Sequence, residues 1–242
     1  DAIARSADEI VDEHKGVYKY DNPHVKSRII QYKKDVVEKE PIGLLIKLFL
    51  FGILSSGVAL FLELYGERLF PFVAQNNVFS IFIRSFFIIG LSEELVKWLF
   101  TYVICWRQKE FNYAYDAIVY AVFISLGFAT IENVIAVVGS EGDLLLALQR
   151  GLITVPAHAF FAIISGYYLG MAKRFEKRGW RRKSKKALIL SVVVPVLAHG
   201  LFDMLLFVSN EVTIILAALF ILYLYVSSYL KVIKVSNETK VM

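Results

Sequence analysis

Acidic, basic and histidine side chains lie within stretches of this sequence that are otherwise apolar. Glu93, Glu94 and Lys97 stand in GLSEELVKWLF, which follows VFSIFIRSFFII and precedes TYVICW. A charge in hydrocarbon costs about 2.5–3.5 kcal/mol on insertion scales, so such residues persist where they face a bundle interior or water. The other ionisable residues inside apolar segments are Asp116, Glu132, His158, His199 and Asp203. A set of this size, spread over several segments, indicates a built site.

The spacing of these residues allows particular pairs to act together. His199 and Asp203 are four residues apart and share a helix face, so Asp203 could orient the imidazole or stabilise its charged form. Glu93 and Lys97 have the same spacing, which allows Lys97 to neutralise part of the charge of Glu93. Glu94 is rotated by about 100° from Glu93 and needs another partner. Either pair could also be purely structural, since membrane histidines often make interhelical hydrogen bonds.

These residue types suit the activation of water. One of Glu93 and Glu94, with Glu93 preferred, is the candidate general base. Asn133, beside Glu132, is uncharged and can donate hydrogen bonds to a developing oxyanion. The sequence has no HExxH motif, G-x-S-x-G nucleophile elbow, Walker loop or GxGxxG, so the common zinc-protease, serine-hydrolase and nucleotide-binding signatures are excluded.

The two histidines leave the question of a metal open. His158 and His199 could position a water and an oxyanion, or they could hold a metal. Two imidazoles with a carboxylate from Glu93 or Asp203 would make an open catalytic Zn²⁺ site. No compact ligand motif lies on one helix, which favours a metal-free site. The expected cofactor is therefore none or Zn²⁺.

Six apolar segments are predicted to position these residues. With 57% hydrophobic residues and a mean hydropathy of +0.57, the composition differs from that of a soluble domain. Each segment has about 20 residues or more, enough to cross a hydrocarbon core of about 30 Å. The fold class is therefore an all-α, polytopic integral membrane helix bundle. The predicted spans are residues 42–62, 78–106, 115–139, 153–172, 187–208 and 211–231.

The chain divides into two parts by composition. Residues 1–41 are polar and charged, and apolar residues recur helically from Val25 to Glu40, which suits an amphipathic surface helix or a solvated leader. Residues 42–242 form the predicted transmembrane domain. Within it, small residues predict close helix packing, and Asp116 is interpreted as marking the membrane interface. These small residues are Gly127, Ala129, Gly166 and Gly170.

The distribution of lysine and arginine predicts the orientation. If residues 1–41 are cytoplasmic and the spans alternate, 22 of the 27 Lys and Arg residues fall on the cytoplasmic side. The opposite side receives only Arg68 and Arg150, together with acidic loop residues that include Glu63 and Glu67. This bias predicts that both termini are cytoplasmic. Because the basic residues cluster beside apolar runs, the expected partner is the lipid bilayer and not nucleic acid.

Helix direction then predicts the depth of the site. At a rise of about 1.5 Å per residue, the glutamates and histidines fall between the membrane midplane and the outer surface. Asp116 falls near the cytoplasmic end and does not join them easily.

Four stretches of the sequence contain these residues: EELVKW (93–98), DAIVYAVFISLGFATIEN (116–133), PAHAFFAIISGYYLG (156–170) and AHGLFDML (198–205). These motifs resemble those of the PrsW family of bacterial intramembrane proteases, and the similarity runs from about Glu40 to the C-terminus. The resemblance implies that the paired glutamates, the Glu–Asn pair, the first histidine and the His/Asp pair are the family's functional residues, and it raises the expected importance of Asp116. The matching positions are Glu93, Glu94, Glu132, Asn133, His158, His199 and Asp203.

The resemblance also implies an activity and a location. It implies an endopeptidase of the bacterial inner membrane that makes the site-1 cut in a single-span substrate such as an anti-sigma factor, near the outer surface, with water activated by Glu and His. It leaves metallo- and glutamate-protease mechanisms open. Family members usually begin with a further transmembrane helix, so either one precedes Asp1 or this branch has replaced it.

Two other functions fit intramembrane ionisable residues. A proton-coupled transporter would use them as a relay, although no inverted repeat and no paired broken helices are visible. A non-catalytic scaffold that binds membrane partners would tolerate alanine at Glu93 and at both histidines.

Overall fold

The computed structural model describes residues 40–236, and the predicted amphipathic helix of the N-terminal segment lies outside this range. Every regular element in the described range is helical, which confirms the all-α prediction. The long helices are α3 (Ile42–Leu69), α5 (Leu91–Cys105), α6 (Ala114–Gly139), α8 (Val155–Lys177), α9 (Arg181–Val208) and α10 (Glu211–Ser236). Shorter pieces are the 3₁₀ turn η1 (Pro71–Ala74), α4 (Val78–Ile83), α7 (Leu144–Gln149) and two π-helical segments, η2 (Arg84–Gly90) and η3 (Arg150–Thr154).

Five helical stretches are long and apolar enough to cross a membrane: Ile42–Leu69, Ala114–Gly139, Leu144–Lys177, Arg181–Val208 and Glu211–Ser236. The remaining predicted span is also helical, because α4, η2 and α5 follow one another without a break from Val78 to Cys105. Its charged residues set it apart from the others in composition. These are Arg84, Glu93, Glu94 and Lys97.

The spans extend further than the apolar runs that predicted them. Helix α3 continues to Leu69, so Glu63 and Glu67 belong to the helix and not to the outer loop predicted for them. Helices α8 and α9 likewise include most of the basic stretch between them. The physical reason is that backbone hydrogen bonds continue a helix past the last lipid-facing residue, whatever the polarity of the next side chains.

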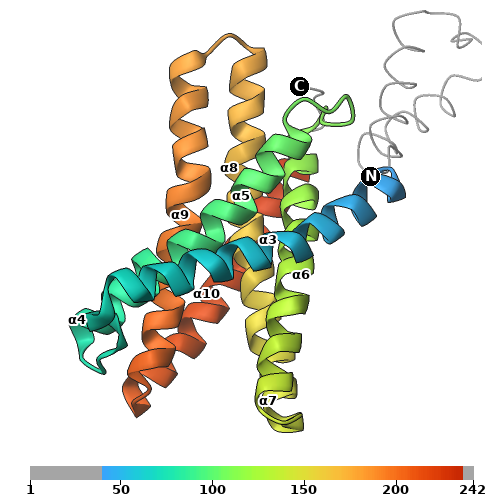
Figure 1. The fold of residues 1–242 in the computed structure, drawn as a ribbon. Helices are drawn as coiled ribbons and strands as arrows, with labels where there is room; N and C mark the ends of the chain where they lie inside the picture. The colour runs from blue at the N-terminus through green and yellow to red at the C-terminus, as the bar shows by residue number, and fades with distance from the viewer. Residues whose placement is uncertain (1–39, 237–242) are drawn as a thin grey trace, which may run out of the picture. The chain divides into compact units, whose positions relative to one another are not determined.

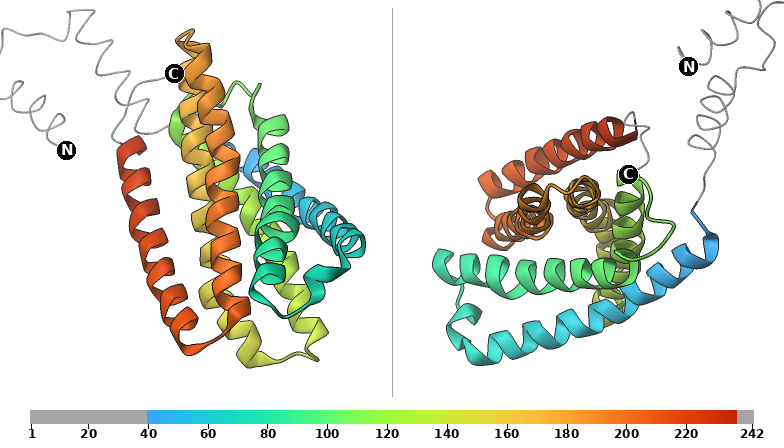
Figure 2. Two further views of the ribbon diagram at one scale, coloured as in Figure 1. Left: turned by 90° about the vertical axis from the view of Figure 1, so that its left-hand side faces the viewer. Right: turned by 90° about the horizontal axis from the view of Figure 1, so that it is seen from above.

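The helices form two sets with different directions. In Figure 1, α6, α8 and α9 run roughly parallel, whereas α3 and α4–η2–α5 cross them obliquely. The view from above in Figure 2 shows α3 and α4–η2–α5 side by side, with α8 and α9 almost end-on. The loops at 70–77, 140–143 and 209–210 lie at one end of the described bundle, and the α8–α9 turn lies at the other (Figures 1 and 2). We call the end with the α8–α9 turn the basic end, because the lysines and arginines of residues 173–186 lie there.

Glycines set the closest helix contacts. A Cβ atom on Gly52 of α3 would overlap the carbonyl oxygen of Ile124 in α6, and one on Gly127 would overlap that of Phe49. On α8, Gly166 and Gly170 make similar contacts with the backbone of α6. The predicted role in close helix packing is therefore confirmed for Gly127, Gly166 and Gly170. Both α3 and α8 pack against α6.

Asp116 stabilises the start of α6 at the basic end. Its carboxylate oxygen Oδ2 accepts hydrogen bonds from the backbone N–H groups of Asn112 (3.0 Å) and Tyr113 (2.7 Å). One turn further on, the hydroxyl of Tyr120 donates to Glu40 at 2.7 Å. The contacts of Asp116 with the backbone of Asn112 and Tyr113 are those of a helix cap, so Asp116 fixes the entry of α6 and is not part of the group of glutamates and histidines described below.

The glycine contact between α3 and α6 yields a stability prediction. Gly52→Leu should destabilise the protein by about 1–3 kcal/mol, because a larger side chain must separate two backbones that touch. Gly57→Leu, on the same helix but with nothing within 4 Å of an added Cβ, is the matched control and should have little effect. Thermal unfolding of the purified variants in detergent measures both, and equal melting temperatures would contradict the assigned contact.

Candidate active site

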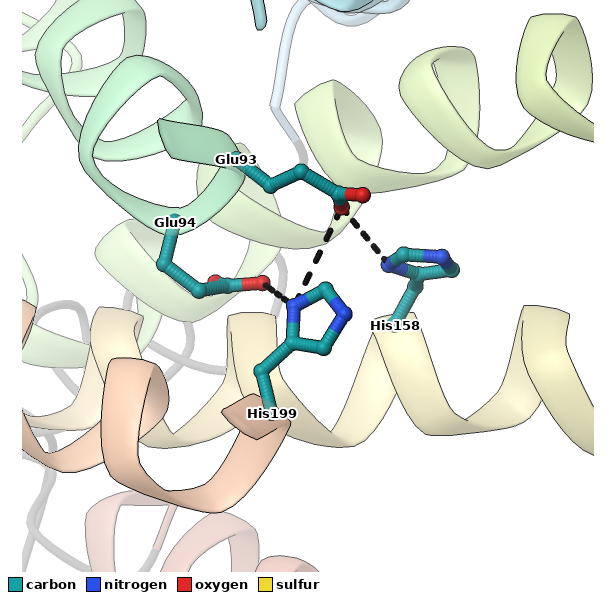
Figure 3. A group of neighbouring side chains, drawn as sticks. All are labelled: Glu93, Glu94, His158 and His199. Carbon is teal, nitrogen blue, oxygen red and sulfur yellow. Dashed lines mark hydrogen bonds and ion pairs between the residues drawn. The ribbon is translucent and has the colours of Figure 1, made fainter. Parts of the chain in front are cut away.

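Four buried ionisable side chains from three helices converge at one point. Glu93 and Glu94 lie in the first turn of α5, His158 on α8 and His199 on α9. Each contributes one oxygen or nitrogen atom, and these atoms all lie within 4.8 Å of one another. Figure 3 shows the two carboxylates and the two imidazoles pointing inward at each other. Residues more than one hundred positions apart in the sequence thus meet in one group.

The approach of α9 to η2 brings His199 into this group. A Cβ atom on Gly200 would lie 2.6 Å from the ring of Phe86, and one on Gly90 would lie 3.2 Å from the backbone nitrogen of Gly200. Only glycines allow backbones to come this close. The adjacent His199 consequently reaches α5, where its Nδ1 lies 2.9 Å from Oε1 of Glu94.

Helices α5 and α8 both begin near the site, and each directly follows a π-helical segment. η2 ends at Gly90, three residues before Glu93, and η3 ends at Thr154, four residues before His158. A π-helical turn contains an extra residue, so it rotates the side chains that follow relative to those before it, and such turns are frequent at functional sites.

Lys97 connects the members of the group. Its Nζ lies 2.6 Å from Oε1 of Glu94, 3.2 Å from Oε2 of Glu93 and 3.2 Å from Nδ1 of His158. The prediction that Lys97 pairs with Glu93 is confirmed, but Glu94 has the shorter contact. The reason is that residues three apart on a helix are neighbours as well as residues four apart. The further partner that Glu94 needs is His199.

His199 is held on both sides of its ring. Its Nε2 faces Oδ2 of Asp203 at 3.4 Å, as the four-residue spacing predicts, while Nδ1 faces Glu94. Phe161 stacks on the imidazole, with ring centroids 4.9 Å apart and 17° between the planes. These contacts fix the orientation of the ring toward the cavity described below.

His158 is oriented by a separate chain of contacts from α6. Its Nε2 lies 2.7 Å from Oε2 of Glu132, whose other oxygen accepts a 2.6 Å hydrogen bond from Arg150. Arg150 also donates through Nε to Oδ1 of Asn133 at 2.8 Å. Since a guanidinium has no acceptor, the oxygen of Asn133 must face it. Asn133 thus holds Arg150, and its side chain does not line the cavity.

A cavity of about 220 Å³ opens beside the group. At about 30 Å³ per molecule, this volume accommodates on the order of seven waters. Its walls come from α3, η2, α5, α6, η3, α8 and α9, toward the helix ends remote from the basic end. The ionisable residues of the lining are Glu63, Glu93, Glu132, Arg150, His158, His199 and Asp203, and the others are Ile89, Thr154, Ala157, Phe161, Phe202, Leu206 and Phe207.

Among the ionisable lining residues, sequence reasoning missed two, Glu63 and Arg150. Both were assigned to the outer surface, because each falls just outside a predicted span. For Glu63 a signal existed: it continues the helical stripe of Gly52, Ser56 and Ala59, which are buried on one face of α3. For Arg150 the sequence shows no comparable pattern.

The central group has donors that suit a metal ion. Two carboxylates and two imidazoles form a donor set that Zn²⁺ accepts, and the four residues are Glu93, Glu94, His158 and His199. Asp203, a candidate ligand from the sequence, lies outside this group. The donor set therefore fits a divalent ion, which would share the carboxylates with the ammonium of Lys97.

Comparisons with known proteins show the family to which the chain belongs. Residues 40–230 match the PrsW family of intramembrane metalloproteases. Protease PrsW of Clostridioides difficile is 34% identical over 209 residues, which cover 86% of this chain and 85% of that protein. Protease PrsW of Oceanobacillus iheyensis is 35% identical over 211 residues, covering 87% of this chain and 91% of that protein.

Protease PrsW of Bacillus subtilis is 34% identical over 175 residues, covering 72% of this chain and 75% of that protein. No solved structure matches the chain. The matched region contains the whole central group and every helix that lines the cavity. The chain therefore belongs to the PrsW family of intramembrane metalloproteases, and it is a membrane-embedded peptide hydrolase.

Proposed function

We propose that this enzyme cleaves a membrane-anchored protein near the outer membrane surface, with Glu93 as the general base that activates the attacking water. The observation that carries the proposal is the convergence of Glu93, Glu94, His158 and His199 beside a cavity. Of the two glutamates, only Glu93 lines this cavity, which supports it as the base.

The residues around the cavity suit the steps of peptide hydrolysis. Glu93 takes a proton from water as the water oxygen attacks the carbonyl carbon, and later passes a proton to the leaving amine as the C–N bond breaks. His158 and His199 position the water and stabilise the oxyanion, while Glu94 and Asp203 orient His199. The ammonium group of Lys97 offsets the repulsion between the two neighbouring carboxylates, so that both can be buried in one site.

A divalent ion, Zn²⁺ in this proposal, would be held by Glu94, His158 and His199 of the central group, which leaves the carboxylate of Glu93 free to act as the base. When bound there, it would supply Lewis-acid polarisation of the scissile carbonyl and of water.

The position of the cavity supports cleavage of the proposed membrane-anchored substrate on its outer side. The site lies toward the helix ends remote from the basic end, and the positive-inside rule would make the basic end cytoplasmic, with both termini there, in a bacterial inner membrane. A single-span protein, such as an anti-sigma factor, would then be cut on its outer side. Its helix must unwind locally, because helical hydrogen bonds shield the carbonyls from attack.

The general-base assignment predicts the effect of one substitution. Glu93→Gln keeps the size of the side chain but removes the base, so cleavage of a single-span reporter should fall by about 10²–10⁴-fold. The control Glu67→Gln, at a residue paired with Arg84 and outside the cavity lining, should cleave at the wild-type rate. Glu93→Gln cleaving as fast as this control would remove Glu93 from the chemistry.

The metal assignment predicts a composition. Purified wild-type protein should contain about one Zn²⁺ per chain by elemental analysis, and His199→Ala should lose it because one of the donors that hold the ion is gone. The Glu67→Gln variant should retain the ion. A wild-type preparation without metal that cleaves at full rate would rule out the zinc site.

The contact chain to His158 predicts a role for Arg150. Arg150→Lys keeps the charge but cannot bridge Glu132 and Asn133 with two N–H groups, so kcat should fall by about 10–100-fold while KM changes little. Arg68→Lys, an exposed residue of α3 that does not line the cavity, is the control. An unchanged kcat, or a rise in KM alone, would speak against positioning of His158 by Arg150.

A further inference from the structure

Three helices meet in one apolar layer next to the cavity. Ala59 of α3, Val96 of α5 and Phe128 of α6 form a cluster of buried side chains. Helices α3 and α6 run away from the basic end, whereas α5 runs toward it. The helical turn that lies next to this cluster on the side away from the basic end is therefore four residues later on α3 and α6, and three residues earlier on α5. On each of the three helices that position is a glutamate.

This second layer brings Glu63, Glu93 and Glu132 to the same cavity. The charges that act on Glu63 are those of the other two glutamates and, more weakly, the opposite charges of His199 and Lys97, which agrees with a position beside the central group. Two of the three have cationic partners: Glu93 lies 3.2 Å from Lys97, and Glu132 lies 2.6 Å from Arg150. Glu63 makes no hydrogen bond or ion pair with any other residue in the range 40–236.

Glu63 is the one carboxylate of the cavity lining that has no pair among residues 40–236. Of the other three, Glu93 is paired with Lys97, Asp203 faces His199, and Glu132 is paired with the guanidinium of Arg150. That guanidinium is already engaged by Glu132 and Asn133. A carboxylate beside apolar walls is costly without a partner, so the free position at Glu63 favours a cation brought from outside.

A metal ion is not that cation in the arrangement described. The donor atoms that lie close enough to share an ion come from the central group, and Glu63 is not among them. Leu206 and Phe207 line the cavity beside the acidic residues and can cover the aliphatic stem of a long basic side chain. A lysine or arginine side chain thus matches both the charge and the apolar surface.

We propose that Glu63 is a specificity-determining residue that binds a lysine or arginine side chain of the substrate close to the scissile bond. This inference rests on the proposed function, because it uses the same cavity for the substrate. The basic residue lies in the outer juxtamembrane part of a single-span protein, where the unwound chain enters the cavity. The pairing places the scissile carbonyl beside Glu93 through the fixed spacing of the second layer.

The test uses the full chain in proteoliposomes with a panel of single-span reporters. The reporters differ at one outer juxtamembrane position at a time, which is Lys, Gln or Glu. Wild-type enzyme should prefer Lys over Gln at one fixed position by about tenfold in kcat/KM, the order expected for one partly buried charge pair. Glu63→Gln should reduce that ratio to about one, and Glu63→Lys should make the Glu reporter the preferred one.

The matched control is Glu67→Gln, one turn further along α3, where the carboxylate pairs with Arg84 at 3.0 Å and does not line the cavity. This variant should keep the wild-type preference. A wild-type enzyme that cleaves all three reporters equally at every position would overturn the inference without any mutation. So would a Glu63→Gln enzyme that retains the preference, or one that loses all cleavage alike, since that would make Glu63 part of the chemistry or of the fold.

Failure of this inference is distinguishable from failure of the proposed function. Cleavage of the Gln reporter by wild-type enzyme and its loss in Glu93→Gln would support the proposed function whatever the outcome at Glu63.

Discussion

Lys97 holds two adjacent carboxylates together inside a bundle of membrane-spanning helices. Its ammonium lies 2.6 Å from Glu94 and 3.2 Å from Glu93, and all three side chains are buried. Desolvating such charges costs several kcal/mol for each ion, and good geometry together with further hydrogen bonds must offset it. The imidazoles of His199 and His158 supply those further contacts, so the members of the central group stabilise one another.

The backbone of the bundle serves this group through a few close contacts. The contact at Gly90 and Gly200 brings α9 against η2, and the contact at Gly52 and Gly127 fixes α3 against α6. Because α3 crosses α6 obliquely (Figure 1), one side of the bundle carries both a tight crossing and, one to three turns further on, the cavity. Close packing and an open site are thus two consequences of the same helix geometry.

The cavity adds a second set of charges to the central group. Arg150 and Glu132 connect the end of α6 with η3 and orient His158 from outside, so the imidazole is held by Lys97 on one side and by Glu132 on the other. Glu63 is the residue that α3 contributes to the lining of the cavity. An enzyme that must receive a peptide from the membrane benefits from such a layer, because charges at the wall can position a substrate before its bond is broken.

The sequence by itself determined the spans, the set of intramembrane ionisable residues and the local pairs of Glu93 with Lys97 and His199 with Asp203, since helical spacing alone decides which side chains on one helix can touch. It also supported the family, through motifs whose order and spacing are visible without coordinates. Only the tertiary structure decided that Glu94 binds His199, that Arg150 holds Glu132 and Asn133, and that Glu63 faces the cavity. Each of these contacts joins residues on different helical segments, so it depends on how closely and at what angle those segments cross. From sequence alone, a charged residue at the end of an apolar run is predicted to lie at the surface. The position of the neighbouring helix can overturn that prediction, because the polarity pattern along one helix carries no information about which residues face it from another.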